Sequence, residues 1–445
     1  MTFWQSLKKT LDQWARQTGF IQRKKILQAF DFLALMTVGQ LGMKHPSLAG
    51  MVEAIQNGMS REGMHRRFSD AAVAFMKKCA QFMLAQKASS MIPLQTKLLR
   101  QFNRLLIFDS TGWDINAKMK DVLPGSGGGA SAANCKLQVC YEYKTGELKF
   151  FDIQPGIVSD NAYTSQLSGH VQLGDLLLID LGYFKMKTFH QIASTEAFFL
   201  SRLLISTKLI SAETLKPIDL PGVLKKVKDN IYQMHVIMGA HKKTQVPCRL
   251  VCMRVSQDIA NERRRKLKRK SRERGNTISQ YHLILADWTL MVTNAPTEWL
   301  PSEMVRSLYA LRWQIELLFK QIKSVLCIHK STTGRENRLR CEIYGKLIMA
   351  VMIHRTHAGI NIRLWNGKHK ELSMEKLFKR IQERAFIILD LLLTSLHKAI
   401  VYLRAEIPRL IKNCIKLHYK SRQTTLELIE FGSCKEEKAV MINVA

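Results

Sequence analysis

Apolar residues recur with a helical period over the first hundred residues of the chain. Ile26, Phe30 and Leu33 follow the spacing of about 3.6 residues that marks one face of a helix, and the same period returns from Val73 onward. The pattern therefore predicts a helical region over residues 1–100.

Two short helical segments inside this region are separated by a glycine. Ser47–Asn57 and Ser60–Phe68 flank Gly58. The second segment carries four basic or titratable residues: Arg61, His65, Arg66 and Arg67. Two short helices joined by a tight turn are typical of a DNA-binding helix-turn-helix. An ordinary helical bundle with a solvated basic face explains the same pattern, so both interpretations stay open.

The pattern changes to short β segments after residue 104. Leu105–Phe108 is an apolar run that ends in Asp109. Lys136–Tyr143 and Leu148–Ile153 alternate between apolar and polar residues on either side of the turn Lys144–Glu147, which predicts a hairpin.

A further apolar run, Asp175–Asp180, is continuous, as expected of a parallel strand buried on both faces. A helical pattern then extends through Phe198 and Phe199. Strand, hairpin, helix and strand, with acidic residues at strand ends, indicate an α/β fold whose sheet is close to the ribonuclease H-like one.

The rest of the chain combines predicted strands, a basic run and long helices. Val246–Val255 and Tyr281–Thr293 predict strands, and Arg263–Arg274 between them is densely basic. A long amphipathic helix follows from Ser302 to about Val325, with Pro301 at its start. Helical periodicity continues over residues 335–430.

Net charge narrows the class of partner. The 445 residues include 68 Lys and Arg against 36 Asp and Glu, a formal charge of +32. Such an excess concentrates polyanions near the protein, and nucleic acid gains affinity because bound phosphates release counterions. A membrane is the rival partner, but the most apolar stretch, Ile26–Val38, is interrupted by Gln28 and Asp31 and is too short to span a bilayer. We therefore expect a soluble, cytoplasmic protein that binds nucleic acid.

The nine cysteines form neither a disulfide framework nor a zinc motif. The closest pairs, Cys135 with Cys140 and Cys248 with Cys252, lie in predicted strands without a second pair at zinc spacing. We expect buried, reduced thiols.

Acidic residues close two of the predicted strands. If the strands that end in Asp109 and Asp180 are parallel neighbours, both carboxylates emerge at one edge of the sheet, where open α/β folds bind ligands. Mg²⁺ prefers such hard oxygen ligands. Two Mg²⁺ ions about 4 Å apart can stabilise the attacking and leaving oxygens of a phosphodiester reaction. Asp114 is the alternative to Asp109.

A third acid lies on the long predicted helix. At about 100° per residue, Glu316 falls within some 60° of Tyr309, Arg312 and Lys323. A surface helix with i,i+4 ion pairs such as Arg312–Glu316 has the same spacing. Spacing alone does not decide between an active-site stripe and a salt-bridged surface.

This helix resembles a known motif. Its Tyr-x2-Arg-x3-Glu-x6-Lys pattern is that of the bacterial cut-and-paste DDE transposases of the insertion-sequence IS-four group. Residues 105–111 and 179–184 are similar to the family's first and second Asp blocks, and Phe199–Arg202 to the Phe-x-x-Arg that follows. The resemblance covers about residues 100–360 in family order, and the basic run is not a family motif.

The resemblance implies a Mg²⁺-dependent transposase, with two ions for which Mn²⁺ can substitute. Its catalytic and metal-binding residues are Asp109, Asp180 and Glu316. The implied DNA-binding residues are Tyr309, Arg312, Lys323, Arg202 and Trp288. In hairpin-forming relatives a Trp at the place of Trp288 stacks on a flipped base. An interior Trp at a strand start is the alternative interpretation.

The architecture implied is a ribonuclease H-like catalytic core interrupted by a β-rich insertion, with helical N- and C-terminal domains. We expect a DNA-binding domain over 1–100, the core over 101–205 and 299–360, the insertion over 206–298 and a dimerising region over 361–445. The implied partners are double-stranded DNA, as terminal inverted repeats and target, and a second copy of the chain at the nucleoid. A catalytically inactive DNA-binding derivative of a transposase is the alternative function.

Overall fold

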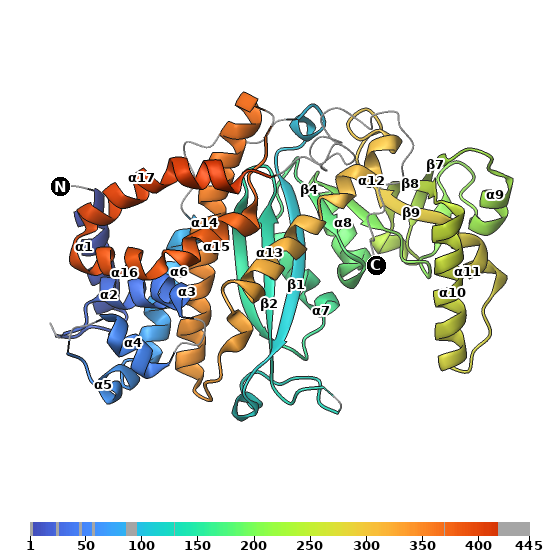
Figure 1. The fold of residues 1–445 in the computed structure, drawn as a ribbon. Coiled ribbons are helices and arrows are strands. Elements are labelled where there is room, and N and C mark those ends of the chain that lie inside the picture. The colour runs from blue at the N-terminus through green and yellow to red at the C-terminus, as the bar shows by residue number, and fades with distance from the viewer. Residues whose placement is uncertain are drawn as a thin grey trace. The chain divides into compact units, whose positions relative to one another are not determined.

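A mixed α/β protein with one large sheet and extensive helical regions is seen in the computed structural model (Figure 1). The structure describes residues 3–23, 26–43, 47–55, 58–85, 96–128, 130–368 and 370–416. The described chain forms two compact units. The first unit contains Ser110–Val158 together with the residues before 95 and after 313, and the second contains Ser159–Trp313 together with residues 96–109.

Helices make up the N-terminal part of the first unit. They are α1 (Phe3–Gln17), α2 (Ala29–Ala34), the π-helix η1 (Leu35–Gly39), α3 (Gln40–Gly42), α4 (Leu48–Ile55), α5 (Arg61–His65) and α6 (Asp70–Ala85). Phe20 joins them, since its ring stacks on Phe75 of α6 at 5.2 Å and contacts Phe32 of α2 at 4.7 Å between centroids. The predicted helical pattern is confirmed over these described residues.

Helices α4 and α5 correspond to the two segments around Gly58. Gly58 has a φ of +74°, and the Ser60 hydroxyl accepts a hydrogen bond from the Gly63 amide at the start of α5. The second helix ends at His65, short of the predicted Phe68. Asn57 lies outside the described residues. A DNA-binding role for this pair stays a prediction.

A β-hairpin and five C-terminal helices complete the first unit. The hairpin pairs β2 (Asn134–Glu142) with β3 (Glu147–Pro155), as predicted, in the order β3-β2-β1. The helices are α13 (Trp313–Ser324), α14 (Glu336–Lys368), α15 (Met374–Glu383), α16 (Ala385–Thr394) and α17 (Leu396–Cys414). Helix α14 packs on α6, η1 and β3. At Gly345 of α14 a Cβ would lie 1.9 Å from the Met36 carbonyl oxygen, so this crossing requires glycine.

The second unit is built on seven strands. They are β1 (Leu105–Asp114, of which residues 105–109 lie in this unit), β4 (Leu176–Ile179), β5 (Phe198–Arg202), β9 (Trp288–Thr293), β8 (Val246–Arg254), β7 (Ile231–Met238) and β6 (Leu209–Ser211), in this order across the sheet. Strand β4 runs parallel to β1 and β5, whereas β9 is antiparallel to β5 and the next strands alternate. The strands of the expected insertion therefore extend the core sheet and do not form a sheet of their own.

Six helices belong to this second unit. They are α7 (Asp160–Leu167), α8 (Met186–Ser194), α9 (Leu220–Lys226), α10 (Gln257–Glu273), α11 (Gln280–Leu285) and α12 (Ser302–Ala310). Helix α8 packs on β5 and β8, and α12 packs on β5 and β7. Short 3₁₀ turns are η2 (Leu99–Gln101), η4 (Ser168–His170), η5 (Leu181–Tyr183) and η6 (Lys242–Thr244), with η3 (Ala117–Met119) and η7 (Ile328–Lys330) in the first unit.

Two predicted elements have the wrong type. The helix expected through Phe199 ends at Ser194, and Phe198–Arg202 is strand β5, because it pairs with β4 on one side and β9 on the other. Residues 281–285, expected in a strand, belong to α11, so the strand begins only at Trp288. A short apolar run fits a buried strand and a buried helix equally well, which is why its period does not decide.

Two predicted boundaries are also wrong. The helix expected from Ser302 to Val325 is divided into α12 and α13, since Leu311 and Arg312 make amide hydrogen bonds to carbonyls three residues back. Strand β1 does not end at Asp109 but continues to Asp114, beyond Ile107, which lies opposite Leu178 of β4.

The cysteines are free and buried, as expected, over the eight that the structure describes. Burial raises the pKa of Cys135 and of Cys248 to about 12, so these thiols stay protonated at neutral pH. Among the described helices, none combines the length and the apolar character that a membrane crossing needs.

Candidate active site

Strand register brings the two predicted aspartates to one level of the sheet. Ile107 of β1 lies opposite Leu178 of β4 in a parallel pairing. Two residues further along each strand are Asp109 and Asp180. Because parallel strands advance together, the two carboxylates leave the sheet side by side, as predicted.

Arg202 reaches the same level from the next strand. Ile179 of β4 pairs with Ser201 of β5, so the residues that follow, Asp180 and Arg202, are also level. An Arg202 Nη2 donates a hydrogen bond to Oδ1 of Asp180 at 3.2 Å. The Arg of the Phe-x-x-Arg block thus lies beside the second aspartate.

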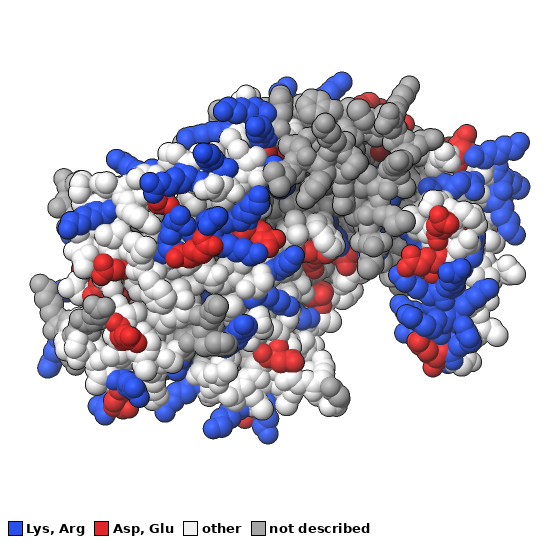
Figure 2. Space-filling model, in the orientation of Figure 1, with Lys and Arg blue, Asp and Glu red and all other residues white. Residues whose placement is uncertain are grey.

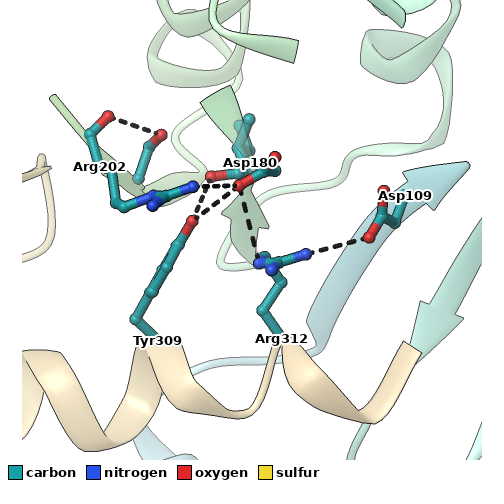
Figure 3. A network of polar contacts seen from close by, with 7 residues as sticks. Asp109, Asp180, Arg202, Tyr309 and Arg312 are labelled. Atoms are coloured by element: carbon teal, nitrogen blue, oxygen red, sulfur yellow. Dashed lines mark hydrogen bonds and ion pairs between the residues drawn. The ribbon is translucent and has the colours of Figure 1, made fainter. Parts of the chain in front are cut away.

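Arg312 bridges the two aspartates (Figure 3). Its Nη1 donates to Oδ2 of Asp109 at 3.0 Å, and its Nε lies 3.8 Å from Oδ1 of Asp180. The side chain is only 10% exposed and comes from the link between α12 and α13. The break in the predicted long helix therefore coincides with the residue that reaches both carboxylates.

Tyr309, at the end of α12, is the third side chain on Asp180. Its hydroxyl lies 3.4 Å from Oδ1 of Asp180 and 3.4 Å from the carbonyl oxygen of Ile179. Oδ1 of Asp180 is thus approached by Arg202, Arg312 and Tyr309 together, as Figure 3 shows.

These contacts set the charge states of the network. Burial alone would raise the pKa of Asp180, but Arg312, Arg202 and the hydrogen bonds that the carboxylate accepts outweigh it and hold that pKa below its usual range. Burial and the neighbouring Asp180 raise the pKa of Tyr309 to about 12. At neutral pH Asp180 is therefore an anion, and Tyr309 is a neutral donor.

Glu316 and Lys323 belong to α13 and to the first unit. Glu316 lies half-buried in the first turn of this helix, and Lys323 lies in the last turn, where its Nζ donates to the Gly112 carbonyl at 2.8 Å. Burial lowers the pKa of Lys323. Over the described residues, no group of three or more His, Cys, Asp or Glu side chains is placed to hold a metal ion.

Two further predicted site residues have partners of their own. Asp114, the alternative to Asp109, accepts a hydrogen bond from the Asn134 amide at 2.9 Å. Trp288 is 4% exposed, and the Arg254 guanidinium lies 4.4 Å from its ring centroid. This is the environment of an interior Trp, and a base-stacking role would require Arg254 to leave the ring.

Sequence reasoning missed two cations near this network. Arg263 of α10 donates to the Thr289 hydroxyl, and Thr289 lies on the same face of β9 as Met291, the register partner of Arg202. Burial, then Arg306 and Arg202, lower the pKa of Arg263, so three guanidinium groups repel one another here. The dense charge of the basic run was the signal for Arg263. Its closeness to Arg306 and Arg202 had no signal, since the three residues are far apart in the sequence.

Comparison with known proteins identifies the family. The transposase DDE domain matches residues 100–352, more than half of the chain. The chain belongs to the DDE transposase family. Its matched range is close to the predicted one, and the predicted class, an enzyme that cleaves DNA and transfers strands, is confirmed.

Full-length relatives agree with the family. The transposase is 28% identical over 453 residues to the transposase for insertion sequence element IS231F of Bacillus thuringiensis subsp. israelensis, covering 96% of this chain and 94% of the relative. It is 26% identical to the transposase for insertion sequence element IS1151 of Clostridium perfringens, over 76% of each chain. A cryo-EM structure of the piggyBac transposase synaptic complex with hairpin DNA is similar with a TM-score of 0.45 and 12% identity, over 94% of this chain and 85% of that one.

Proposed function

We propose that this transposase binds the terminal inverted repeats of an insertion sequence and uses Asp109, Asp180 and Glu316 to cleave its ends and join them to target DNA. The observation that carries the proposal is the shared level of Asp109 and Asp180 on neighbouring parallel strands, with one guanidinium between them. Glu316 enters through the resemblance of its helix to the family motif.

The donor set fits a divalent metal ion. Asp109 and Asp180 offer hard carboxylate oxygens, and both already attract one cation, Arg312, to the space between them. The Asp180 carboxylate is anionic at neutral pH, because its pKa is lowered. When bound, two Mg²⁺ ions, or Mn²⁺ in their place, would stabilise the attacking and the leaving oxygen.

The cations of the network would bind and orient the DNA backbone. Arg312 offers a planar fork that matches a phosphate, and Lys323 offers a point charge. Arg202 keeps Asp180 ionised and oriented through their hydrogen bond. The Tyr309 hydroxyl can donate a hydrogen bond, because its raised pKa keeps it protonated at neutral pH. With metal held by Asp109 and Asp180, the Arg312 guanidinium would be available for the phosphate.

Two backbone features support a ribonuclease H-like core. Strands β1, β4 and β5 run parallel, and residues 105–109 of β1 belong to the second unit. The β2–β3 hairpin follows β1 in the strand order and belongs to the first unit. The insertion over 206–298 would then be the extension from β9 to β6 with helices α9 to α11. We further propose double-stranded DNA as partner, as inverted repeats and target, a homodimer in the synaptic complex, and association with the nucleoid.

The alternative is a catalytically inactive DNA-binding derivative of a transposase. It predicts binding of the transposon ends without nicking in any divalent metal. The intact pair of aspartates and the ionised state of Asp180 favour the active enzyme.

Amide substitutions test the three acids. Asp109→Asn, Asp180→Asn and Glu316→Gln preserve shape but remove a negative metal ligand. We expect each to slow end cleavage in Mg²⁺ by at least about 10³-fold, because metal stabilisation is worth several kcal/mol. Binding of the ends should change only a few-fold, and Ca²⁺ should suppress cleavage because it tolerates looser geometry.

Asp114→Asn is the matched control on the same strand. It should leave cleavage intact, because Asp114 bonds to Asn134 and to none of the cations in the network. Retained cleavage in any one of the three acid variants would remove that residue from the site.

A further inference from the structure

The basic run is one helix with two kinds of cation. Helix α10 has 17 residues, Gln257–Glu273, of which eight are Lys or Arg and three are acidic. Lys and Arg favour helices, so their density is compatible with a single continuous element. The cations on one face of the helix contact the protein, whereas those on the other face are exposed to solvent.

Cations on the inner face anchor the helix to the sheet. Arg263 Nη1 donates to the Trp288 carbonyl at 2.9 Å, and its Nη2 donates to the Thr289 hydroxyl at 3.1 Å. Arg264 forms an ion pair with Asp287. Ala260 is buried on the same side. These guanidinium groups are used for packing and are half-buried.

Cations on the opposite face project into solvent. Four of the six exposed cations of α10, Arg265, Lys268, Arg269 and Arg272, form an outer stripe on this face. Their spacings of three, four and seven place them within about 100° of one another, whereas Arg263 lies about 160° from Arg265. The ion pair between Arg269 and Glu273, at 3.7 Å with both side chains over 60% exposed, binds weakly. Figure 2 shows Lys and Arg gathered over α10.

We propose that this outer stripe contacts the phosphates of one DNA strand without reading its sequence, a role that rests on the proposed function. Arg265 and Arg272 are separated by about 10 Å along the helix axis. Phosphates of one strand follow at about 3.4 Å along the duplex axis, so the stripe matches about three of them. Its flexible side chains can follow the backbone without fixed geometry.

Duplex DNA fits this surface better than a membrane does. A membrane-bound helix needs an apolar face beside its cations, but the apolar residues of α10, Ile259, Ala260 and Leu267, are buried or half-buried. The family of this chain acts on DNA. A second copy of the chain, with its net charge of +32, would repel the stripe.

Salt dependence of DNA binding tests the stripe apart from catalysis. Arg265, Lys268, Arg269 and Arg272 are replaced by Ala in Asp109→Asn protein, without divalent metal, and titrated with a duplex of arbitrary sequence over a KCl series. The loss of about three phosphate contacts should lower the log–log slope by about 2.7. A failed catalytic assignment would leave this measurement unaffected.

The control variant removes the same charge from the same unit. Lys225, Lys226, Lys242 and Lys243 are exposed cations outside α10. Their replacement by Ala should change the slope by less than half as much. An unchanged slope in the stripe variant, an equal fall in the control, or loss of binding only to anionic phosphatidylserine vesicles would each overturn the proposal. If circular dichroism shows the fourfold variant unfolded, Arg265→Ala with Arg272→Ala should still lower the slope by roughly half as much.

Discussion

The network around Asp180 and the outer stripe of α10 gather positive charge in opposite ways. In the network, Arg202 and Arg312 approach Asp180, and Arg312 also holds Asp109. On the outer stripe, the ion pair that Arg269 forms with Glu273 is long and exposed. The first arrangement fixes positions over a few ångströms, and the second provides attraction over a Debye length of about 8–10 Å.

The difference matches the two roles proposed here, catalysis for the network around Asp180 and attraction of DNA for the outer stripe. Partly buried, paired charges shift pKa values and depend on geometry, but salt screens them little. The contribution of exposed cations to DNA affinity depends strongly on salt and little on geometry. The inner face of α10 belongs with the first kind, since Arg263 and Arg264 are bonded to strand β9 and to Asp287.

The largest expected effect is a loss of stability, and it tests whether Trp288 belongs to the core on which the inner face of α10 packs. Trp288→Ala removes a buried ring from beneath Arg254 and from beside the Arg263 anchor, so it should lower the free energy of unfolding by about 3–5 kcal/mol. Urea unfolding measures this. End nicking per folded molecule should be retained if Trp288 is a core residue.

The base-stacking role makes the opposite prediction for the same variant. A folded protein of nearly wild-type stability that nicks the end but forms no hairpin would assign Trp288 to the DNA. Fluorescence of 2-aminopurine at the second base from the transposon end would then rise with wild type and not with the variant.

A smaller effect concerns Arg312, which contacts the two carboxylates that are proposed to hold the metal. Arg312→Gln should tighten Mn²⁺ binding in the absence of DNA by about tenfold, because a charge-assisted hydrogen bond worth roughly 1.5 kcal/mol no longer competes. Electron paramagnetic resonance of free Mn²⁺ measures the affinity. Arg264→Gln, which breaks an Arg–Asp pair on α10, is the control and should leave it unchanged. Equal or weaker Mn²⁺ binding by Arg312→Gln would contradict the competition.

The smallest effect is a pH dependence of stability. The pKa of Asp180 is lowered in the folded protein, so its ion pairs stabilise the fold fully above the unfolded value of about 3.9 and are lost as pH falls through the lower folded value. Asp180→Asn should therefore flatten the loss of stability between pH 5 and 3. The difference should be about 1 kcal/mol, because the carboxylate side chain is still 27% exposed and water screens it.

Asp114→Asn is again the control, since its partner is the neutral amide of Asn134. An Asp180→Asn variant that loses stability with acid as steeply as wild type would show that Arg202 and Arg312 do not stabilise the folded state through this carboxylate.

The strands that carry the aspartates could be predicted because their apolar runs are bounded by charges and turns. The hairpin was predictable for the same reason, since the alternation of β2 and β3 brackets Lys144–Glu147. Phe198–Arg202 and residues 281–285 were not, because segments of five residues are too short to show a period. Pairing with β4 and β9 decides the first of these, and pairing is a long-range property.

The candidate site was predictable in its residues more than in its contacts. Asp109, Asp180 and the residues of the long-helix motif stand out by type and spacing. The break after α12 does not, because Leu308, Leu311 and Ile315 continue the apolar period across it. Arg263 and Arg306 could not be connected with Arg202 from the sequence, since the pairing of β5 with β9 and the packing of α12 on β5 bring their elements together.

The first unit is assembled from segments that are made at different times. Helix α6 ends at Ala85, and its packing partner α14 is complete only at Lys368. At about 5–20 residues per second, the ribosome takes roughly 15–60 s to supply that partner. A polypeptide that stops early therefore exposes the apolar face of α6 to proteases and chaperones. We expect damaged copies of the element, shortened at their 3′ ends, to yield degraded chains and no stable N-terminal fragment that competes with the full-length protein for DNA.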